Sequence, residues 1–246
     1  MARSCPFGIC DGTGIVVDDV TRTSAYCRCR TQVVANARAR GLSAVIPKKY
    51  RGVSFERPPV TEISPRIVAV VRRYVQDLET QLHAGRGLWL FGPHGTGKTT
   101  LAMLVSKHAL DAGRSVAIYS LPRLLAEIRT TFDDGSVSSY TELIDRLTAV
   151  DLLHIDDVGA EKTSDWVLEQ LYAIVNARYE DEKAIVLTTN LNDAGELADQ
   201  VGQRTVSRLE EMCTILPVVG ADLRRQTFGV ADDEPPAESP VRWDVA

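Results

Sequence analysis

Short apolar runs alternate along the chain with segments whose apolar residues recur at helical spacing. The apolar runs are rich in Val, Ile and Leu, and polar or turn-forming residues bound them, which predicts buried strands. We expect strands over residues 88–91, 116–119, 152–156, 184–188 and 213–219. Because helical segments separate these runs, the sequence predicts an α/β fold with a parallel sheet flanked by helices on both faces.

The segments between the apolar runs carry the 3.6-residue periodicity of amphipathic helices. We expect helices over residues 65–84, 99–112, 121–132, 140–149, 164–180 and 201–211. The buried face of the first helix is expected to hold Ile67, Val70, Val71, Tyr74, Val75 and Leu78. Ser164 is expected to cap the helix that runs to residue 180.

A glycine-rich segment follows the first strand and reads Gly92-Pro93-His94-Gly95-Thr96-Gly97-Lys98-Thr99. It matches the phosphate-binding loop G-x-x-x-x-G-K-[ST] in the strand–loop–helix context that this motif requires. The glycines allow backbone N–H groups to surround a phosphate, and the helix N-terminus adds partial positive charge. Lys98 is expected to reach the β- and γ-phosphates and Thr99 to hold Mg²⁺. We predict a nucleoside triphosphate site formed by Gly92, Pro93, His94, Gly95, Thr96, Gly97, Lys98, Thr99 and Thr100.

Two consecutive carboxylates, Asp156 and Asp157, close the third apolar run. The carboxyl ends of parallel strands are where ligands bind in such sheets. We expect Asp156 to hold Mg²⁺ and Asp157 to polarise the attacking water, as in a Walker B element. Asn190 closes the next run and could orient that water. A cap for the following helix is an equally good interpretation of Asn190.

Two arginines, Arg204 and Arg208, are four residues apart and share one face of the last predicted helix. Arg208 could act as an arginine finger on the γ-phosphate held by a neighbouring subunit. The alternative is a surface arginine paired with Glu210, Glu211 or another carboxylate.

Four of the five cysteines, Cys5, Cys10, Cys27 and Cys29, lie within the first 29 residues. In a reducing compartment such clustering favours a metal over disulfides. We predict a tetrahedral zinc site, although neither pair has the usual C-x₂-C spacing. Free thiols in a flexible tail are the alternative. Cys213 lies in an apolar run and is expected to be a small buried residue.

The chain divides into four parts by composition. We expect a cysteine-rich zinc module over residues 1–30, a linker over 31–62, a nucleotide-binding domain over 63–230 and a disordered acidic tail over 231–246. Residues 1–57 hold ten Lys or Arg against four Asp or Glu, a balance of +6, which leaves −11 for the rest of a chain whose net charge is −5. This basic part could bind a polyanion or an acidic protein, or form a solvated surface.

The sequence contains no apolar stretch long enough to cross a membrane, and its first residues lack the apolar segment of a secretory signal. We therefore expect a cytoplasmic protein with no membrane partner.

Taken together, these motifs resemble those of the DnaC/DnaI-type AAA+ replicative helicase loaders. They are also similar to those of the IstB-type ATPases that assist DNA transposition. The resemblance rests on residues 92–99, 154–161, 187–190 and 204–209 and covers about residues 45–230. It implies an AAA+ P-loop NTPase without a full helical lid, since only some thirty residues follow Pro217.

The resemblance also implies roles for single residues. Asn190 is similar to sensor 1, and Arg208 to the arginine finger, with Arg204 beside it. Arg224 resembles the sensor 2 residue, with Arg225 as the second choice.

In the family, a helical insertion after the second strand contacts single-stranded DNA. In this sequence the insertion corresponds to about residues 121–131, with Arg123 and Arg129 as candidate phosphate contacts. Solvated surface arginines are an equally good interpretation.

The function that the resemblance implies is an ATP-driven loader. Its core would bind ATP and Mg²⁺, assemble through the ATP site into a homo-oligomer, and hydrolyse ATP weakly, with stimulation by assembly or DNA. Its zinc module would bind the replicative DNA helicase for delivery onto single-stranded DNA. One alternative is an IstB-like transposition helper that binds duplex DNA, although those helpers lack the cysteine module. Another is a small-molecule or nucleotide kinase, which the paired arginines and the missing lid disfavour.

Overall fold

The computed structural model of the chain describes residues 5, 7–18, 21–30, 33–34, 42, 45–133, 137–159, 164–191 and 194–226. The predicted tail at 231–246 and positions 160–161 of the family motif lie outside these residues. Within the described part of the chain, no helix is both long enough and apolar enough to span a bilayer.

The predicted parallel sheet is confirmed. Its strands are β3 (Gly87–Phe91), β4 (Val116–Ser120), β5 (Leu152–Val158), β6 (Ala184–Thr189) and β7 (Cys213–Pro217). They lie in the order β4-β5-β6-β3-β7, and every neighbouring pair is parallel. β3 is the second strand from one edge, between β6 and β7, and all its residues are buried. The loop after β3 therefore opens at the carboxyl edge of the sheet, beside the ends of β5 and β6.

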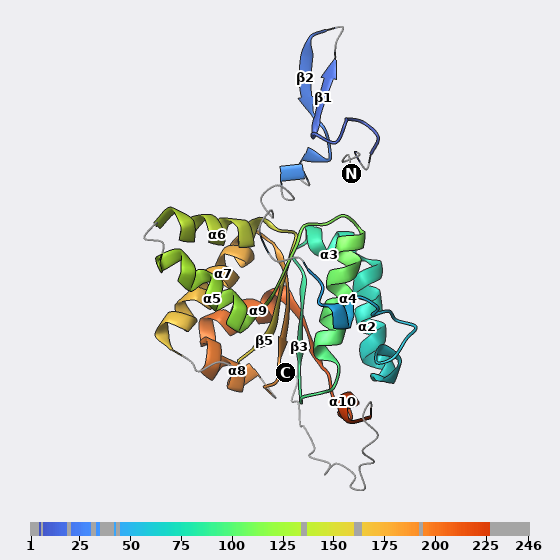
Figure 1. Ribbon diagram of the computed structural model, residues 1–246, viewed down its shortest axis with the longest axis vertical. Helices are drawn as coiled ribbons and strands as arrows, with labels where there is room; N and C mark the ends of the chain where they lie inside the picture. The colour runs from blue at the N-terminus through green and yellow to red at the C-terminus, as the bar shows by residue number, and fades with distance from the viewer. Residues whose placement is uncertain are drawn as a thin grey trace.

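Helices cover both faces of the sheet (Figure 1). On one face lie α2 (Pro65–Gln76), α3 (Leu78–His83) and α4 (Lys98–Asp111). The other face is covered by α5 (Leu121–Asp133), α6 (Val137–Ala149), α7 (Asp165–Glu180), α8 (Ala194–Val201) and α9 (Gln203–Met212). A short helix, α10 (Leu223–Gln226), follows β7 and is all that the described residues contain in the place of a lid.

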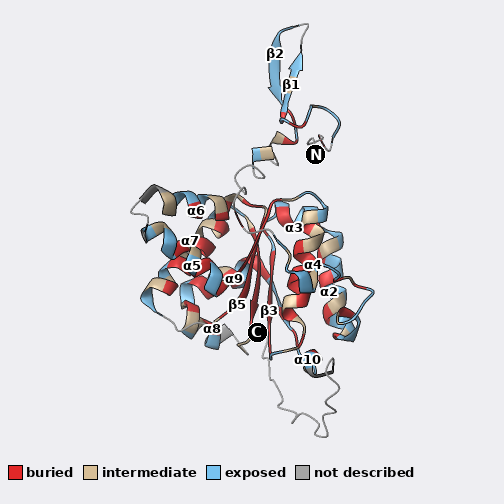
Figure 2. Cartoon of the chain, viewed as in Figure 1, coloured by how far each residue is buried: buried red, intermediate tan, exposed pale blue. Residues whose placement is uncertain are grey.

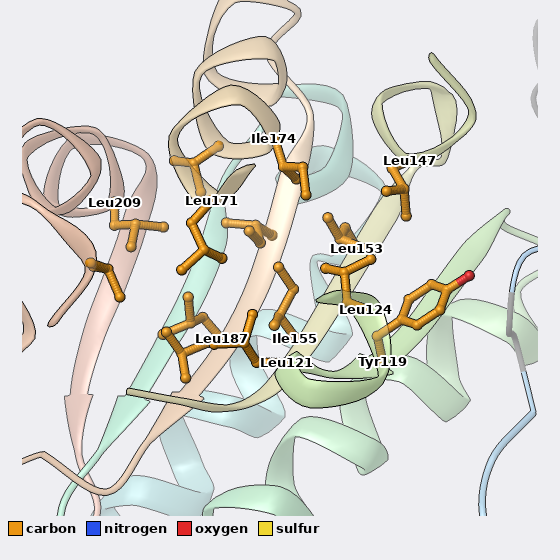
Figure 3. Close-up of a cluster of buried hydrophobic side chains, with 14 of the residues drawn as sticks. Tyr119, Leu121, Leu124, Leu147, Leu153, Ile155, Leu171, Ile174, Leu187 and Leu209 are labelled. Atoms are coloured by element: carbon orange, nitrogen blue, oxygen red, sulfur yellow. The ribbon is translucent and has the colours of Figure 1, made fainter. Parts of the chain in front are cut away.

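The buried side chains form one cluster on each face of the sheet (Figure 2). On the α5–α9 face, Leu153 and Ile155 of β5 pack among Leu124, Leu147 and Leu171 from the covering helices (Figure 3). Both faces of the central strands are thus apolar. This explains why their sequences are continuous apolar runs rather than alternating patterns.

The structure corrects several predicted element boundaries. The predicted helix over 65–84 is two helices that meet at Asp77, and Val70, which we expected on its buried face, is exposed. The predicted helix over 201–211 begins only after Gly202, which has a φ of 86°, and α8 precedes it without having been predicted. The predicted strand over 213–219 ends at Pro217. A residue with positive φ interrupts a helix, so Gly202 separates α8 from α9.

The N-terminal residues form a small module with a core of its own. β1 (Ile15–Asp18) and β2 (Thr23–Tyr26) pair as an antiparallel hairpin that the sequence did not predict. Most of its residues are exposed, so no alternation of buried and exposed positions marks the strands. The module's core consists of buried cysteines with partly buried Val16 and Val33.

The predicted linker region contains two 3₁₀ turns, η1 (Lys48–Tyr50) and η2 (Val60–Glu62). Phe55 and Val60 are buried there with residues of α2 and α4. The second half of this region therefore packs on the domain, whereas the domain boundaries themselves stay predictions.

A buried arginine, Arg178 of α7, joins three elements on the α5–α9 face. Its side chain is fully buried, and its guanidinium donates to backbone carbonyls at the end of α6, in the loop before β5 and at the start of β6. The acceptors are the carbonyl oxygens of Leu147, Thr148, Val150, Asp151 and Ala184. One side chain thereby satisfies carbonyls that the helix end and the loop leave without partners.

We expect Arg178→Ala to lower the free energy of unfolding by at least about 3 kcal/mol, because it leaves several buried carbonyls without donors. Urea denaturation would measure the change. The matched control is Arg66→Ala at an exposed position of α2, where we expect a change within about 0.5 kcal/mol. Equal stability of the two variants would contradict this account of Arg178.

Candidate functional site

The predicted phosphate loop joins β3 to α4 at the carboxyl edge of the sheet. α4 begins at Lys98, directly after Gly97, which lies in the left-handed region with a φ of 98°. Gly92 and Gly95 also have positive φ, at 132° and 78°. A Cβ atom on Gly92 would lie 2.6 Å from a carbonyl oxygen of the segment after β7, and one on Gly95 would collide with the Asp222 carboxylate. Both the dihedral angles and the close contacts require glycine in this loop.

Lys98 is folded back onto the loop that precedes it. Its Nζ donates to the carbonyl oxygens of Gly92 at 2.7 Å and Pro93 at 2.6 Å, and the side chain is buried. Burial lowers the pKa of Lys98 to about 8, while the negative charge of Asp157 opposes the shift. The ammonium group of Lys98 is thus bonded to two loop carbonyls, and phosphate oxygens could take the place of these carbonyls as its hydrogen-bond acceptors.

The other predicted loop residues have structural positions that suit a tight turn. Thr96 is buried, and its hydroxyl donates to the carbonyl of Pro93 at 3.0 Å. Thr100 is buried in the first turn of α4, and His94 is exposed.

The segment after β7 lies against the loop. The N–H of Leu223 donates to the carbonyl of Gly95 at 3.1 Å. Arg224 follows in α10 with an exposed side chain, and its charge is close enough to contribute to the lowered pKa of Lys98. The predicted sensor 2 position is therefore beside the phosphate loop. The side chain of Arg225 lies outside the described residues.

Asp156 is a buried carboxylate at the end of β5. It accepts a hydrogen bond from the hydroxyl of Thr188 at 2.6 Å, and Nε2 of His154 lies 4.0 Å from the same oxygen. Burial would raise the pKa of Asp156, but the nearby His154, with the hydroxyls of Thr188 and Thr99, lowers it below its ordinary value. Asp156 is therefore ionised at neutral pH.

Asp157 and Asn190 meet at the same edge of the sheet. Asp157 has a φ of 58°, and its Oδ1 accepts from Nδ2 of Asn190 at 3.2 Å. Positive φ is uncommon for residues other than glycine and clusters at functional sites. The contact with Asp157 favours a role for Asn190 in the site over a role as a helix cap.

The donor set at the end of β5 fits Mg²⁺. Thr99 and Asp156 offer a hydroxyl and a carboxylate, and the hydroxyl is near enough to lower the pKa of the carboxylate. Hard oxygen donors of this kind, with phosphate oxygens, are the ligands that Mg²⁺ prefers. Thr99 and Asp156 are therefore the residues that could hold Mg²⁺, and this role stays a prediction.

Tyr50 is a residue of the site that the sequence did not reveal. Burial raises the pKa of its phenol, with further contributions from the charges of Asp156 and Asp157, so the ring lies near the Walker B carboxylates. Tyr50 belongs to the predicted linker, and no motif marks it. Only the packing of η1 against α4 brings it here.

Arg208 lies on α9 with its guanidinium against α7. Its Nε donates to Oδ1 of Asn176 at 2.7 Å and its Nη2 to the hydroxyl of Tyr172 at 3.2 Å. The rings of Tyr172 and Tyr179 lie 4.9 and 5.6 Å from the guanidinium carbon. Arg204, one turn earlier, is exposed and accepts from Nη1 of Arg208 through its carbonyl. Arg208 is thus a half-buried, well-supported cation rather than a partner of Glu210 or Glu211.

The two arginines predicted to contact DNA lie in different surroundings. Arg123 is exposed on α5. Arg129 is also exposed, and its guanidinium lies 4.8 Å from the centre of the Trp166 ring. Phe132 is about half exposed and packs on Tyr140 with the ring centres 5.1 Å apart. Arg129, Phe132 and Trp166 line one shallow pocket.

The four N-terminal cysteines converge. The sulfur atoms of Cys5, Cys10, Cys27 and Cys29 all lie within 4.8 Å of one another. The Sγ atoms of Cys5 and Cys27 are 3.7 Å apart, and those of Cys10 and Cys29 are 3.4 Å apart. Tetrahedral zinc with Zn–S bonds of about 2.3 Å requires sulfur atoms roughly 3.8 Å apart. The donor set therefore fits a structural zinc ion.

Backbone N–H groups favour the thiolate of Cys5, whereas burial and the neighbouring thiols raise the pKa of Cys29. The N–H of Cys10, with those of Ile9 and Phe7, lowers the pKa of Cys5 to about 6, although burial acts in the opposite direction. The N–H of Gly12 donates to Sγ of Cys10 at 3.4 Å. Such donors stabilise the thiolate, which is the form that binds metals. Turns and bends, rather than regular strands, bring the four cysteines together.

Comparison with known proteins identifies the family. The profile described as IstB-like ATP binding protein matches residues 67–229, which is more than half of the chain. The chain belongs to this family.

Individual relatives of this IstB-like protein are helicase loaders. It is 25% identical over 166 residues to the replicative helicase loader DnaC of Buchnera aphidicola subsp. Schizaphis graminum, covering 67% of this chain and 65% of that relative. It is 27% identical over 162 residues to DnaC of Escherichia coli (strain K12), covering 65% and 64%. The chain therefore spans just under two thirds of the length of these relatives.

A solved structure confirms the AAA+ fold of the IstB-like domain. The crystal structure of the DnaC helicase loader superposes with a TM-score of 0.61 at 26% identity, over 70% of this chain and all of that one. The predicted resemblance to DnaC/DnaI-type loaders is thereby confirmed, whereas the roles of single residues stay predictions.

The lowered pKa of Lys98 predicts a pH-dependent affinity for nucleotide. The phosphates bind the ammonium form, so affinity is full below pH 8 and falls as the pH rises through 8. We expect the dissociation constant of a fluorescent ATP analogue to increase about tenfold between pH 7 and pH 9 at constant ionic strength. In Lys98→Arg the guanidinium stays charged, so any binding that remains should not change with pH. Parallel profiles for the two proteins would contradict the assignment.

The cysteine cluster predicts bound metal. Elemental analysis of the anaerobically purified full chain should find about one zinc per molecule. Cys27→Ser should lose that zinc, because it removes one of four ligands. The control is Cys213→Ala in β7, which lies outside the cluster and should keep the metal. The zinc site would be refuted if the wild-type protein contained no zinc, or if Cys27→Ser still contained about one zinc per molecule.

Proposed function

We propose that this IstB-like protein is an ATP-hydrolysing loader that binds the replicative hexameric DNA helicase and helps to place it on single-stranded DNA. The proposal places its action in the cytoplasm, with ATP, Mg²⁺ and Zn²⁺ as cofactors. The observation that carries it is the four-cysteine cluster in front of an AAA+ core of the DnaC type. The cluster gives the module a fixed fold and hence a surface for a protein partner.

The polar groups at the edge of the sheet support ATP hydrolysis. Lys98 would hold the β- and γ-phosphates, and Asp157 would orient and polarise the attacking water with help from Asn190. Mg²⁺, when bound through Thr99 and Asp156, would neutralise charge on the phosphates. The contact of Asn190 with Asp157 at 3.2 Å is the geometry that this pairing requires.

The environment of Arg208 supports a role as an arginine finger in trans. A guanidinium has five N–H donors, and the contacts of Arg208 to Asn176, Tyr172 and Arg204 within the described residues use three. Two donors, one on each terminal nitrogen, remain for phosphate oxygens of a neighbouring subunit. Because α7 and α9 hold the side chain firmly, little further entropy is lost when it meets a phosphate.

The aromatic group beside α5 supports binding of single-stranded DNA. Unpaired bases stack on exposed aromatic rings, while arginines neutralise the adjacent phosphates. Phe132 and Trp166 would supply rings and Arg129 a charge. Arg123 lacks such neighbours among the contacts of the described residues, so we assign the DNA contact to Arg129 first.

The second candidate function is a helper ATPase of DNA transposition, which the IstB-like family match favours. Such a helper would bind duplex DNA and recruit a transposase. It would not require the cysteine module.

The deciding experiment mixes the full chain with the purified replicative helicase of its host. We expect a stable complex on size-exclusion chromatography that Cys27→Ser loses and Trp166→Ala retains. Trp166→Ala should instead weaken binding of a fluorescent single-stranded oligonucleotide by about tenfold. Tight binding to duplex DNA, without a complex with the helicase, would favour the transposition helper and refute the loader.

A further inference from the structure

The two Walker B carboxylates lie in a β-bulge. In the pairing of β5 with β6, Ile155 is opposite Leu187 and Val158 is opposite Thr189. Asp156 and Asp157 together therefore face one residue, Thr188. In a regular strand, consecutive side chains point to opposite faces of the sheet. The bulge, with Asp157 at a φ of 58°, removes that constraint on two adjacent carboxylates.

One hydroxyl group bonds to both members of this bulge. The Oγ1 of Thr188 donates its proton to Oδ1 of Asp156 at 2.6 Å. The same oxygen accepts from the backbone N–H of Asp157 at 2.9 Å. The bulge takes this N–H out of the regular ladder, so the hydroxyl supplies the acceptor that a buried N–H needs. Thr188 is fully buried.

We propose that Thr188 is a positioning residue of the nucleotide site, whose hydroxyl fixes the Asp156 carboxylate for Mg²⁺ and the Asp157 backbone for hydrolysis. This inference rests on the proposed ATPase function. The end of β6 then supports both carboxylates. Thr188 donates to Asp156, and Asn190, two residues later and just after the strand, donates to Asp157.

The number of donors explains why Asp156 and Asp157 have different hydrogen-bond partners. An ionised carboxylate only accepts, so Asp156 needs a donor, and the single proton of Thr188 satisfies that need at one oxygen. The proton cannot serve Asp157 as well. The Asp157 side chain therefore depends on the amide of Asn190 while its backbone depends on Thr188. The two carboxylates thus keep separate orientations although they are adjacent in sequence.

The alternative is that Thr188 merely fills space in the core. Valine has nearly the same shape and lacks the hydroxyl, so Thr188→Val tests the hydrogen bonds with little change in packing. Thr188→Ser restores the hydroxyl. The matched control is Thr189→Val, the next residue of β6. Thr189 is also buried, but among the described residues its hydroxyl accepts only from the N–H of Leu191.

Two measurements on the full chain separate the roles. The first is the Mg²⁺ concentration that half-saturates binding of a fluorescent ATP analogue, and the second is the kcat and KM of ATP hydrolysis. For Thr188→Val we expect the half-saturating Mg²⁺ concentration to rise about fivefold and kcat to fall about tenfold, because one hydrogen bond to a charged group is lost. The KM for ATP should stay within about threefold of the wild-type value. Thr188→Ser and Thr189→Val should stay within about twofold of wild type in both measurements.

The inference is overturned if Thr188→Val keeps the wild-type Mg²⁺ dependence, or if Thr188→Ser is as impaired as Thr188→Val. If Thr188→Val does not fold, as judged by its thermal unfolding, the pair Thr188→Ser and Thr188→Ala decides, since these two differ only by the hydroxyl. Should the wild-type protein fail to hydrolyse ATP, the proposed ATPase function fails. The Mg²⁺ dependence of binding would still show whether Thr188 positions Asp156.

Discussion

The carboxyl edge of one parallel sheet brings together the phosphate loop, the two carboxylates and the side chains that support them. The phosphate loop follows β3, β5 carries the two carboxylates, and β6 carries the hydroxyl of Thr188 and is followed directly by the amide of Asn190. Because parallel strands all end at the same edge, segments separated by about a hundred residues meet there. The helices on both faces fix the strands by burial. The site is therefore only as rigid as the two apolar clusters that hold the sheet.

At the carboxyl edge of the sheet, buried charged groups are stabilised by neighbouring charged and polar groups rather than by water. Burial weakens the charged form of Lys98, whereas Asp157 favours it. The polar neighbours of Asp156 likewise keep that carboxylate ionised despite its burial. A protein with such a site holds its charges in place before the phosphates arrive. Preorganisation of this kind is the largest contribution to stabilising charge that develops in a transition state.

Two other features lie on separate parts of the chain and are built differently. The cysteine module has almost no apolar core, and its fold depends on four sulfur atoms that meet within 4.8 Å. Arg208 depends on packing, since α7 supplies a hydrogen-bond acceptor and two aromatic rings around its guanidinium. The first is suited to a partner surface that must fold independently. The second holds a cation in a fixed position, as the proposed role of Arg208 in trans requires.

The sequence by itself determined the features whose cause is local or periodic. The glycines of the phosphate loop, the apolar runs of the sheet and the Asp156–Asp157 pair all follow from chemistry within a few residues of chain. Contacts between distant segments decided the rest. Thr188 entered only as a member of the 187–190 segment, and its partners Asp156 and Asp157 lie 32 and 31 residues earlier in the chain. Tyr50 and Arg178 belong to no motif; Tyr50 lies in the predicted linker, and Arg178 donates to carbonyls as far as 31 residues away. The break at Asp77 and the exposure of Val70 likewise depend on which helix face meets the sheet. A hydrogen bond or a buried face is a property of two segments, so only the tertiary structure could assign these roles.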